Sequence, residues 1–110
     1  MSYSTFANLQ YLDGDSIPLA ASDAEILRTL DDARLHHDVA KSLATLFQGQ
    51  EAWFTFYGGS GTLEHLLCVV SRRWPDVAFG VQGRGEELRD VWVREFLAGE
   101  VVFGQGPFTE

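Results

Sequence analysis

The chain has 110 residues, a length typical of one domain with a single hydrophobic core, and its 45% of apolar residues exclude a globally disordered protein. Sixteen acidic residues against eight basic ones give a formal net charge of −8. The field of such a chain repels phosphate backbones, so it disfavours direct binding to nucleic acid and favours positively charged protein surfaces as partners, although acidity can also serve solubility alone.

The single cysteine, Cys68, excludes an internal disulfide and is typical of a protein from a reducing compartment. No apolar run is long enough to cross a membrane, and no basic segment followed by an apolar run comes after Met1. We therefore expect a cytoplasmic protein without a signal peptide and without membrane contact.

The N-terminal residues show the period of a strand. Apolar or β-favouring side chains alternate with polar ones over residues 3–11, as in a strand with one buried face. The pattern breaks at residues 13–15 and resumes over residues 17–19, which predicts a short return strand. Pro18 would place that strand at a sheet edge because proline lacks a backbone donor.

Two helices, or one bent helix, are predicted between residues 22 and 48. Ser22 and Glu25 match a capping box, so the first helix is expected to begin there. The apolar stripe then changes phase, which predicts a break within residues 31–38, and Gly49 ends the second helix. The two stripes that are out of phase are Ile26, Leu27 and Leu30, and then Leu35, Val39, Leu43 and Leu46.

Residues 51–82 form the most regular part of the sequence and predict a strand, a turn, a helix and a second strand. Aromatic residues fill positions 51–57, glycines interrupt at 58–61, and Thr62 is placed to cap a helix that Pro75 ends. The buried stripe of this helix is expected to be Leu63, Leu66, Leu67, Val70 and Trp74, and the alternating residues of the next strand are Val77, Phe79 and Val81.

The last third of the chain predicts a strand meander. A turn at residues 83–85 precedes a strand at 90–96, and Ala98 with Gly99 forms a tight link to a strand at 100–103. Residues 104–110 are expected to be loosely held. We thus expect one α+β domain over residues 1–110, in which 1–50 supply a strand and helices and 51–103 supply a β-α-β-β-β unit.

The sequence contains few residues in catalytic or metal-binding patterns. Ser60 and His65 are close in sequence but lack a nucleophile motif, and the glycine turn before the helix could hold an anion but lacks the spacing of a phosphate loop. His36 and His37 are adjacent, so they point in different directions on a helix. We expect no enzymatic activity, no metal site and no cofactor.

The acidic residues are instead the candidate binding site. If the carboxylates of the first third share a face, they could imitate a phosphate track and occupy the nucleic-acid groove of a basic protein. The alternative is an ordinary solvated helical face. The predicted partner-binding residues are Asp13, Asp15, Asp23, Glu25, Asp31, Asp32, Asp38, Glu86 and Glu87.

Five features follow one another between residues 53 and 103: a helix end with Trp-Pro-Asp at 66–76, a strand at 77–79, an acidic turn at 85–87, a strand at 90–92 and a glycine hairpin at Gly99. In this order they resemble the ferredoxin-like domain of small plasmid and phage proteins related to YubB. The resemblance implies a ferredoxin-like antiparallel sheet with helices on one face, to which residues 1–50 add a strand and a helical pair. It implies no enzymatic site, and such small acidic proteins are similar in character to anti-CRISPR inhibitors.

Two functions of different classes follow. The first is a phage-encoded or mobile-element-encoded inhibitor that binds the basic groove of a CRISPR-type host defence complex as a DNA mimic. The alternative is a homo-oligomeric structural or regulatory domain, such as a homodimer, that associates through an aromatic sheet face with Trp53, Tyr57 and Trp92 as anchors. A third option is an enzyme that works at the turn of residues 58–61.

Overall fold

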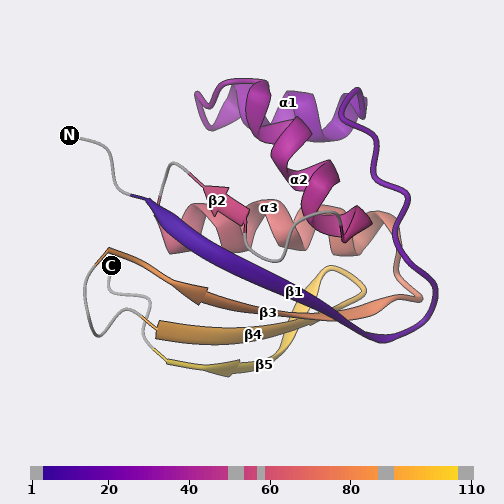
Figure 1. Cartoon of the computed structure of the whole chain (residues 1–110). Helices are drawn as coiled ribbons and strands as arrows, with labels where there is room; N and C mark the ends of the chain where they lie inside the picture. Colours follow the sequence, from indigo (N-terminus) through magenta and orange to yellow (C-terminus); the bar gives the residue numbers. More distant parts are fainter. Residues whose placement is uncertain (1–3, 50–53, 57–58, 87–90, 107–110) are drawn as a thin grey trace.

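An antiparallel sheet with helices on one side forms the part of the chain that the computed structural model describes, namely residues 4–49, 54–56, 59–86 and 91–106 (Figure 1). Within these ranges there are five strands and three helices. In chain order they are β1 (Thr5–Asp13), α1 (Ala24–Asp32), α2 (Asp38–Gln48), β2 (Phe54–Phe56), α3 (Ser60–Arg73), β3 (Ala78–Arg84), β4 (Val91–Leu97) and β5 (Glu100–Gln105).

The sheet has the strand order β2-β1-β3-β4-β5, and every neighbouring pair is antiparallel. Since β2 and β3 both run antiparallel to β1, they are parallel to each other. Helix α3 connects them and so passes over β1, which lies between them. The predicted strand-helix-strand unit is thus confirmed, with β1 inserted between its two strands. The ferredoxin-like topology is not confirmed by this order, because α1 and α2 both precede β2 and the described residues between β3, β4 and β5 form no helix.

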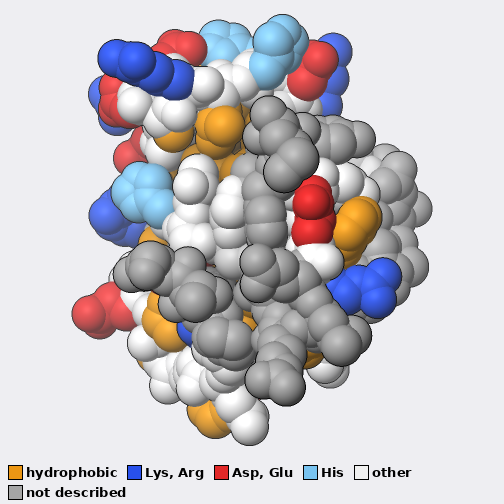
Figure 2. All heavy atoms as spheres, turned by 90° about the vertical axis from the view of Figure 1, so that its left-hand side faces the viewer, with side chains coloured by type: hydrophobic (Ala, Val, Ile, Leu, Met, Phe, Trp, Pro, Cys, Tyr) orange, Lys and Arg blue, Asp and Glu red, His pale blue; other side chains and the backbone are white. Residues whose placement is uncertain are grey.

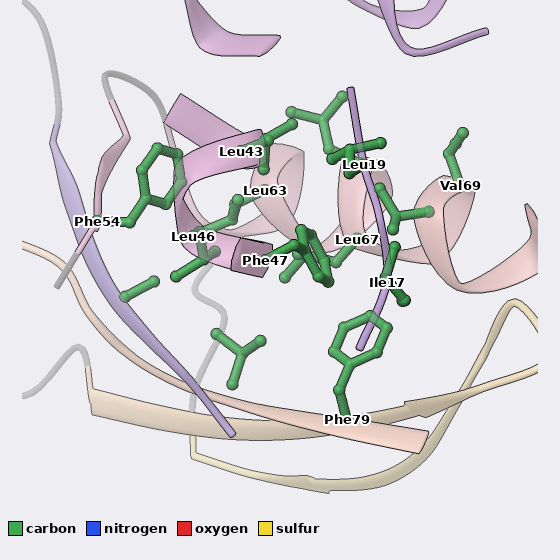
Figure 3. Close-up of a cluster of buried hydrophobic side chains, with 14 of the residues drawn as sticks. Ile17, Leu19, Leu43, Leu46, Phe47, Phe54, Leu63, Leu67, Val69 and Phe79 are labelled. Carbon is green, nitrogen blue, oxygen red and sulfur yellow. The ribbon is translucent and has the colours of Figure 1, made fainter. Parts of the chain in front are cut away.

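All three helices lie on the same side of the sheet, and no described helix covers its other side (Figure 1). The hydrophobic core fills the space between the helices and the sheet (Figure 3). Phe79 stands at its centre, with the ring of Phe47 edge-on at 5.1 Å and the ring of Phe96 stacked at 5.1 Å. The predicted helix stripe is confirmed, since Leu63, Leu66, Leu67 and Val70 are buried and Trp74 packs against them.

The return strand predicted at residues 17–19 is wrong. Ile17 and Leu19 are each 1% exposed, but they belong to an irregular segment that crosses the core rather than to the sheet (Figure 3). The backbone N–H of Ile17 donates to Tyr11 Oη at 3.0 Å, and that hydroxyl donates to the carbonyl of Phe47. The tyrosine therefore supplies part of the hydrogen bonding that a strand partner would have given.

Both predicted helix starts are displaced by a short distance. Helix α1 begins at Ala24, and its cap is Asp23 rather than Ser22, because Asp23 Oδ1 accepts from the N–H groups of Glu25 at 3.1 Å and Ile26 at 3.2 Å. Helix α3 begins at Ser60, before the predicted cap Thr62, with Gly59 as a cap that has no side chain. The remaining helix boundaries agree with the sequence patterns.

Two left-handed turns confirm the predicted breaks. Gly49 ends α2 with a φ of 72°, and Ala98 and Gly99 join β4 to β5 with φ values of 54° and 84°. The break between α1 and α2 falls within the predicted residues 31–38. The last strand is longer than predicted and reaches Gln105, where Arg94 Nη1 donates to the Gln105 carbonyl at 2.9 Å.

Candidate functional site

Of the nine acidic residues predicted to bind a partner, the eight that the structure describes do not come together on one face. Asp13 and Asp15 are exposed at the end of β1, and Glu86 lies beyond β3, where it accepts from the N–H of Ser4 at 2.6 Å. Glu87 lies outside the described residues. The other five form two groups at the ends of α1, so the structure divides the predicted site among several places.

Asp23 and Glu25 are held by an arginine from another helix. Asp23 and Arg73 form an ion pair with a hydrogen bond, and Arg73 Nε lies 3.4 Å from Glu25 Oε2. Burial tends to raise the pKa of Asp23, but the hydrogen bonds from Arg73 and from the N–H groups of Ile26 and Glu25 outweigh it and lower the pKa. With its side chain only 10% exposed, Asp23 fixes α1 to α3 and is poorly placed to meet a partner.

The largest group of predicted acids lies at the α1–α2 corner, where Asp31 and Asp32 end one helix and Asp38 begins the next. These carboxylates share the corner with cationic and titratable groups. His37 Nε2 lies 2.7 Å from Asp31 Oδ1, and Lys41 Nζ lies 3.9 Å from Asp38 Oδ1. Figure 2 shows acidic, basic and histidine side chains mixed at the top of the face that it draws, so the corner is charged but not uniformly negative.

Ser60 is a core residue whose hydroxyl is already engaged. It is 7% exposed, accepts a hydrogen bond from Trp92 Nε1 at 2.9 Å and lies 3.4 Å from Thr5 Oγ1. His65 is exposed farther along α3 and lines a hollow of about 400 Å³ with Thr29 and Asp32. The two residues proposed for an enzyme therefore face different surroundings, one in the core and the other at the surface.

The prediction that Trp92 is an exposed anchor is wrong, because Trp92 is 1% exposed and its ring lies against Gly83. The sequence contained the signal for this: Trp92 lies four residues before Phe96 in an alternating strand, so both point to the same buried face. Trp53 and Tyr57 lie outside the described residues. The surface that sequence reasoning missed is mostly aliphatic.

The exposed large apolar residues gather on one hairpin. Of the six such residues in the described part of the chain, five belong to β4 and β5, and the sixth, Leu12, lies near the end of β1. We call the five the hairpin patch: Val91 (56% exposed), Leu97 (39%), Val101 (38%), Val102 (59%) and Phe103 (47%). All six residues of β5 are exposed, since this strand forms the edge of the sheet.

The sheet side that carries no helix has few charged residues. The side chains of β3 and β4 that point to it include one arginine, Arg84, and one glutamate, Glu95, whose charges cancel. On β1 the corresponding positions that pair with β3 are Phe6, Asn8, Gln10 and Asp13, and Glu100 of β5 pairs with Leu97 on the same side. We call this surface the open face, and it carries one arginine against three acidic residues.

An apolar hollow of about 280 Å³ lies between α2 and β2. Leu35, Val39, Phe54 and Phe56 line it together with the polar residues His36, Asp38, Ser42 and Thr55.

No group of histidine, cysteine and carboxylate side chains that could hold a metal ion occurs among the described residues. Cys68 is half-buried on α3, where burial and the nearby charge of Glu64 raise the pKa of its thiol despite the opposing effect of Arg72.

Comparisons with models of known families, with curated proteins and with solved structures find no match to this chain. Within the described ranges, none of the helices has the length and apolar character needed to span a membrane.

Proposed function

We propose that this chain is a protein-binding domain that acts by association rather than by turnover, through the hairpin patch and the adjoining open face. The observation that carries the proposal is the concentration of five exposed apolar side chains on β4 and β5. Large exposed apolar patches are rare on monomeric proteins and mark interaction sites. By their register Leu97 and Phe103 point to the open face, whereas Val101 pairs with Phe96 and points to the helix side at the sheet edge.

The proposal is tested by capture experiments with two variants that differ only in where charge is added. Val91→Asp with Phe103→Asp places two carboxylates on the hairpin patch, whereas Ser16→Asp with Ser22→Asp places two on exposed loop positions away from it. The immobilised proteins are incubated with lysate of the organism that encodes the chain. We expect the first variant to lose the captured proteins and the second to retain them.

The charge of the chain favours a second candidate, an acidic inhibitor of a nucleic-acid-binding complex. Its basis is the net charge of −8 together with Asp31, Asp32 and Asp38, which lie exposed at the α1–α2 corner. These carboxylates would meet the basic groove of a host defence complex of the CRISPR type in place of DNA, with no cofactor and no turnover. An origin in a phage or another mobile element belongs to this candidate.

A third variant separates the two candidates. Asp31→Asn, Asp32→Asn and Asp38→Asn remove three charges without touching the hairpin patch. If this variant loses the captured proteins while Val91→Asp with Phe103→Asp keeps them, the proposal of association through the hairpin is overturned in favour of the acidic inhibitor. Two predictions from the sequence apply to both candidates. They are the resemblance of residues 53–103 to the ferredoxin-like domain of YubB-related proteins and the cytoplasmic location.

A further inference from the structure

We infer that the partner of the hairpin patch is a second copy of this chain, joined by antiparallel pairing of the two β5 edges into one continuous sheet. This inference rests on the proposed function, because it names the partner for the same surface. It commits to the edge of β5, rather than to the broad open face, as the place where the two copies meet.

The edge of β5 has the properties of a strand that is able to accept a further strand. It pairs with β4 alone in the described part of the chain and is six residues long, whereas β2 at the opposite edge has three described residues. An edge strand presents unpaired N–H and C=O groups, and proteins commonly protect such edges with lysine or proline. Residues 100–105 contain neither, and three of them are Val101, Val102 and Phe103.

The register of β5 against β4 contains one irregularity, between Glu95 and Phe96 of β4, where Val102 is the extra residue on β5. A bulge of this kind increases the local twist of an edge and can hinder further pairing. Here the strand continues past it, since Phe103, Gly104 and Gln105 pair again with β4. Pairing of two copies therefore has to accommodate one twisted position in each of the two edges.

The sequence of β5 is complementary to itself. A two-fold axis between Val102 and Phe103 places each of these residues opposite the other in the second copy. The same axis sets Glu100, the one charged residue of β5, opposite Gln105 of the second copy. No like charges then face each other across the new pair of strands, and its centre is apolar on both sides.

The net charge of −8 does not oppose this arrangement. The acids of the α1–α2 corner lie at the helical end of the molecule, on the opposite side from β5 (Figure 1). The smallest extent of the molecule is 24 Å, whereas the Debye length at physiological ionic strength is about 8 Å, so charges that far apart are largely screened. Pairing through β5 therefore keeps the acidic ends of the two copies apart.

The test is sedimentation velocity of the purified full chain over a series of concentrations. We expect the mass to rise from the 12.3 kDa of one copy to twice that value. Val102→Pro removes a backbone donor from the edge, and Val102→Lys adds a charge there. Val91→Lys adds the same charge to β4, away from the edge. We expect both Val102 variants to remain monomeric and Val91→Lys to dimerise as the wild type does, with circular dichroism confirming that each variant is folded.

Each other outcome has a defined meaning. If the wild type remains monomeric at every concentration, the inference that the partner is a second copy is overturned. In that case the proposed function still stands if Val91→Asp with Phe103→Asp abolishes capture of another protein, and it fails if this variant does not. If Val91→Lys abolishes dimerisation and the Val102 variants do not, the copies meet through the open face and edge pairing is overturned. Hydrogen exchange provides a second measurement, since edge pairing should slow exchange of β5 amides only as concentration rises.

Discussion

Trp92 donates a hydrogen bond from its indole Nε1 to Ser60 Oγ at 2.9 Å, inside the core, and so joins β4 to the first residue of α3. Both side chains are buried, and Thr5 of β1 lies 3.4 Å from the same hydroxyl. Three separate elements thus meet at one polar group, which fixes the start of α3 over the sheet.

Ser60→Ala is expected to destabilise the fold, because it removes the acceptor of the buried indole N–H. Loss of one partner from a buried hydrogen bond costs roughly 1–3 kcal/mol in the free energy of unfolding. The measurement is urea denaturation followed by tryptophan fluorescence. Ser42→Ala is the matched control, since Ser42 is on α2 and its hydroxyl makes a long bond of 3.5 Å at an exposed position. Equal stability of the two variants would contradict the structural role of Ser60.

Gly83 and Gly80, two glycines of the same strand, should differ in their response to substitution by alanine. A Cβ at Gly83 would lie 2.1 Å from Trp92 Cζ2, so the ring or the strand would have to move. Overpacking of this kind costs about 1–3 kcal/mol or more in the free energy of unfolding. A Cβ at Gly80 would meet its nearest atoms, in Glu95 and Leu12, at 3.6 Å, an ordinary contact. Thermal unfolding should therefore show a large fall in the midpoint temperature for Gly83→Ala and little change in it for Gly80→Ala.

The sequence predicted elements whose signals are local. The phase change of the apolar stripe placed the break between α1 and α2, and Gly49 marked the end of α2 through its left-handed backbone. The alternation over Val77, Phe79 and Val81 predicted the buried face of β3, and all three side chains are buried. In each of these cases a pattern within one element determined the outcome.

The failures arose where distant residues decide the structure. Alternation over residues 17–19 fits a strand, but the same burial occurs in an irregular segment that crosses a core, and only the approach of Tyr11 distinguishes the two. The pairing of Asp23 with Arg73, 50 residues away, depends on how α1 packs against α3. Charge counting therefore overestimated the number of acids available to a partner, and it overlooked the apolar hairpin because its residues looked like ordinary strand residues.

The ion pair of Asp23 with Arg73 should make stability depend on pH in the acid range. Because the folded protein lowers the pKa of Asp23, its ionised form contributes stability that is present above its unfolded pKa of about 3.9 and is lost as pH falls through the folded pKa. Arg73→Gln should lower the free energy of unfolding by roughly 1 kcal/mol at neutral pH, a value reduced for the partial exposure of Arg73.

Below about pH 4 the difference between wild type and Arg73→Gln should begin to shrink, and it should disappear below the lowered folded pKa of Asp23, where the carboxyl is protonated in both proteins. Chemical denaturation at a series of pH values measures this difference in the free energy of unfolding. Lys41→Gln is the control, since Lys41 is 77% exposed and its pair with Asp38 spans 3.9 Å. A difference for Arg73→Gln that stayed constant down to pH 2 would show that the arginine stabilises the fold through packing on Trp74, whose ring lies 5.0 Å away, rather than through Asp23.

Ionic strength should separate the two candidate modes of binding by the sign of its effect. Raising salt from 0.1 M to 1 M shortens the Debye length from roughly 10 Å to roughly 3 Å. Binding of the carboxylates at the α1–α2 corner to a basic groove would weaken steeply, as protein–DNA binding does. Pairing of β5 edges depends on backbone hydrogen bonds and apolar contacts, and both copies carry a charge of −8, so screening removes a weak repulsion. The dimer dissociation constant from sedimentation should therefore fall or stay within about threefold over this range, and a tenfold rise would contradict association through the β5 edge.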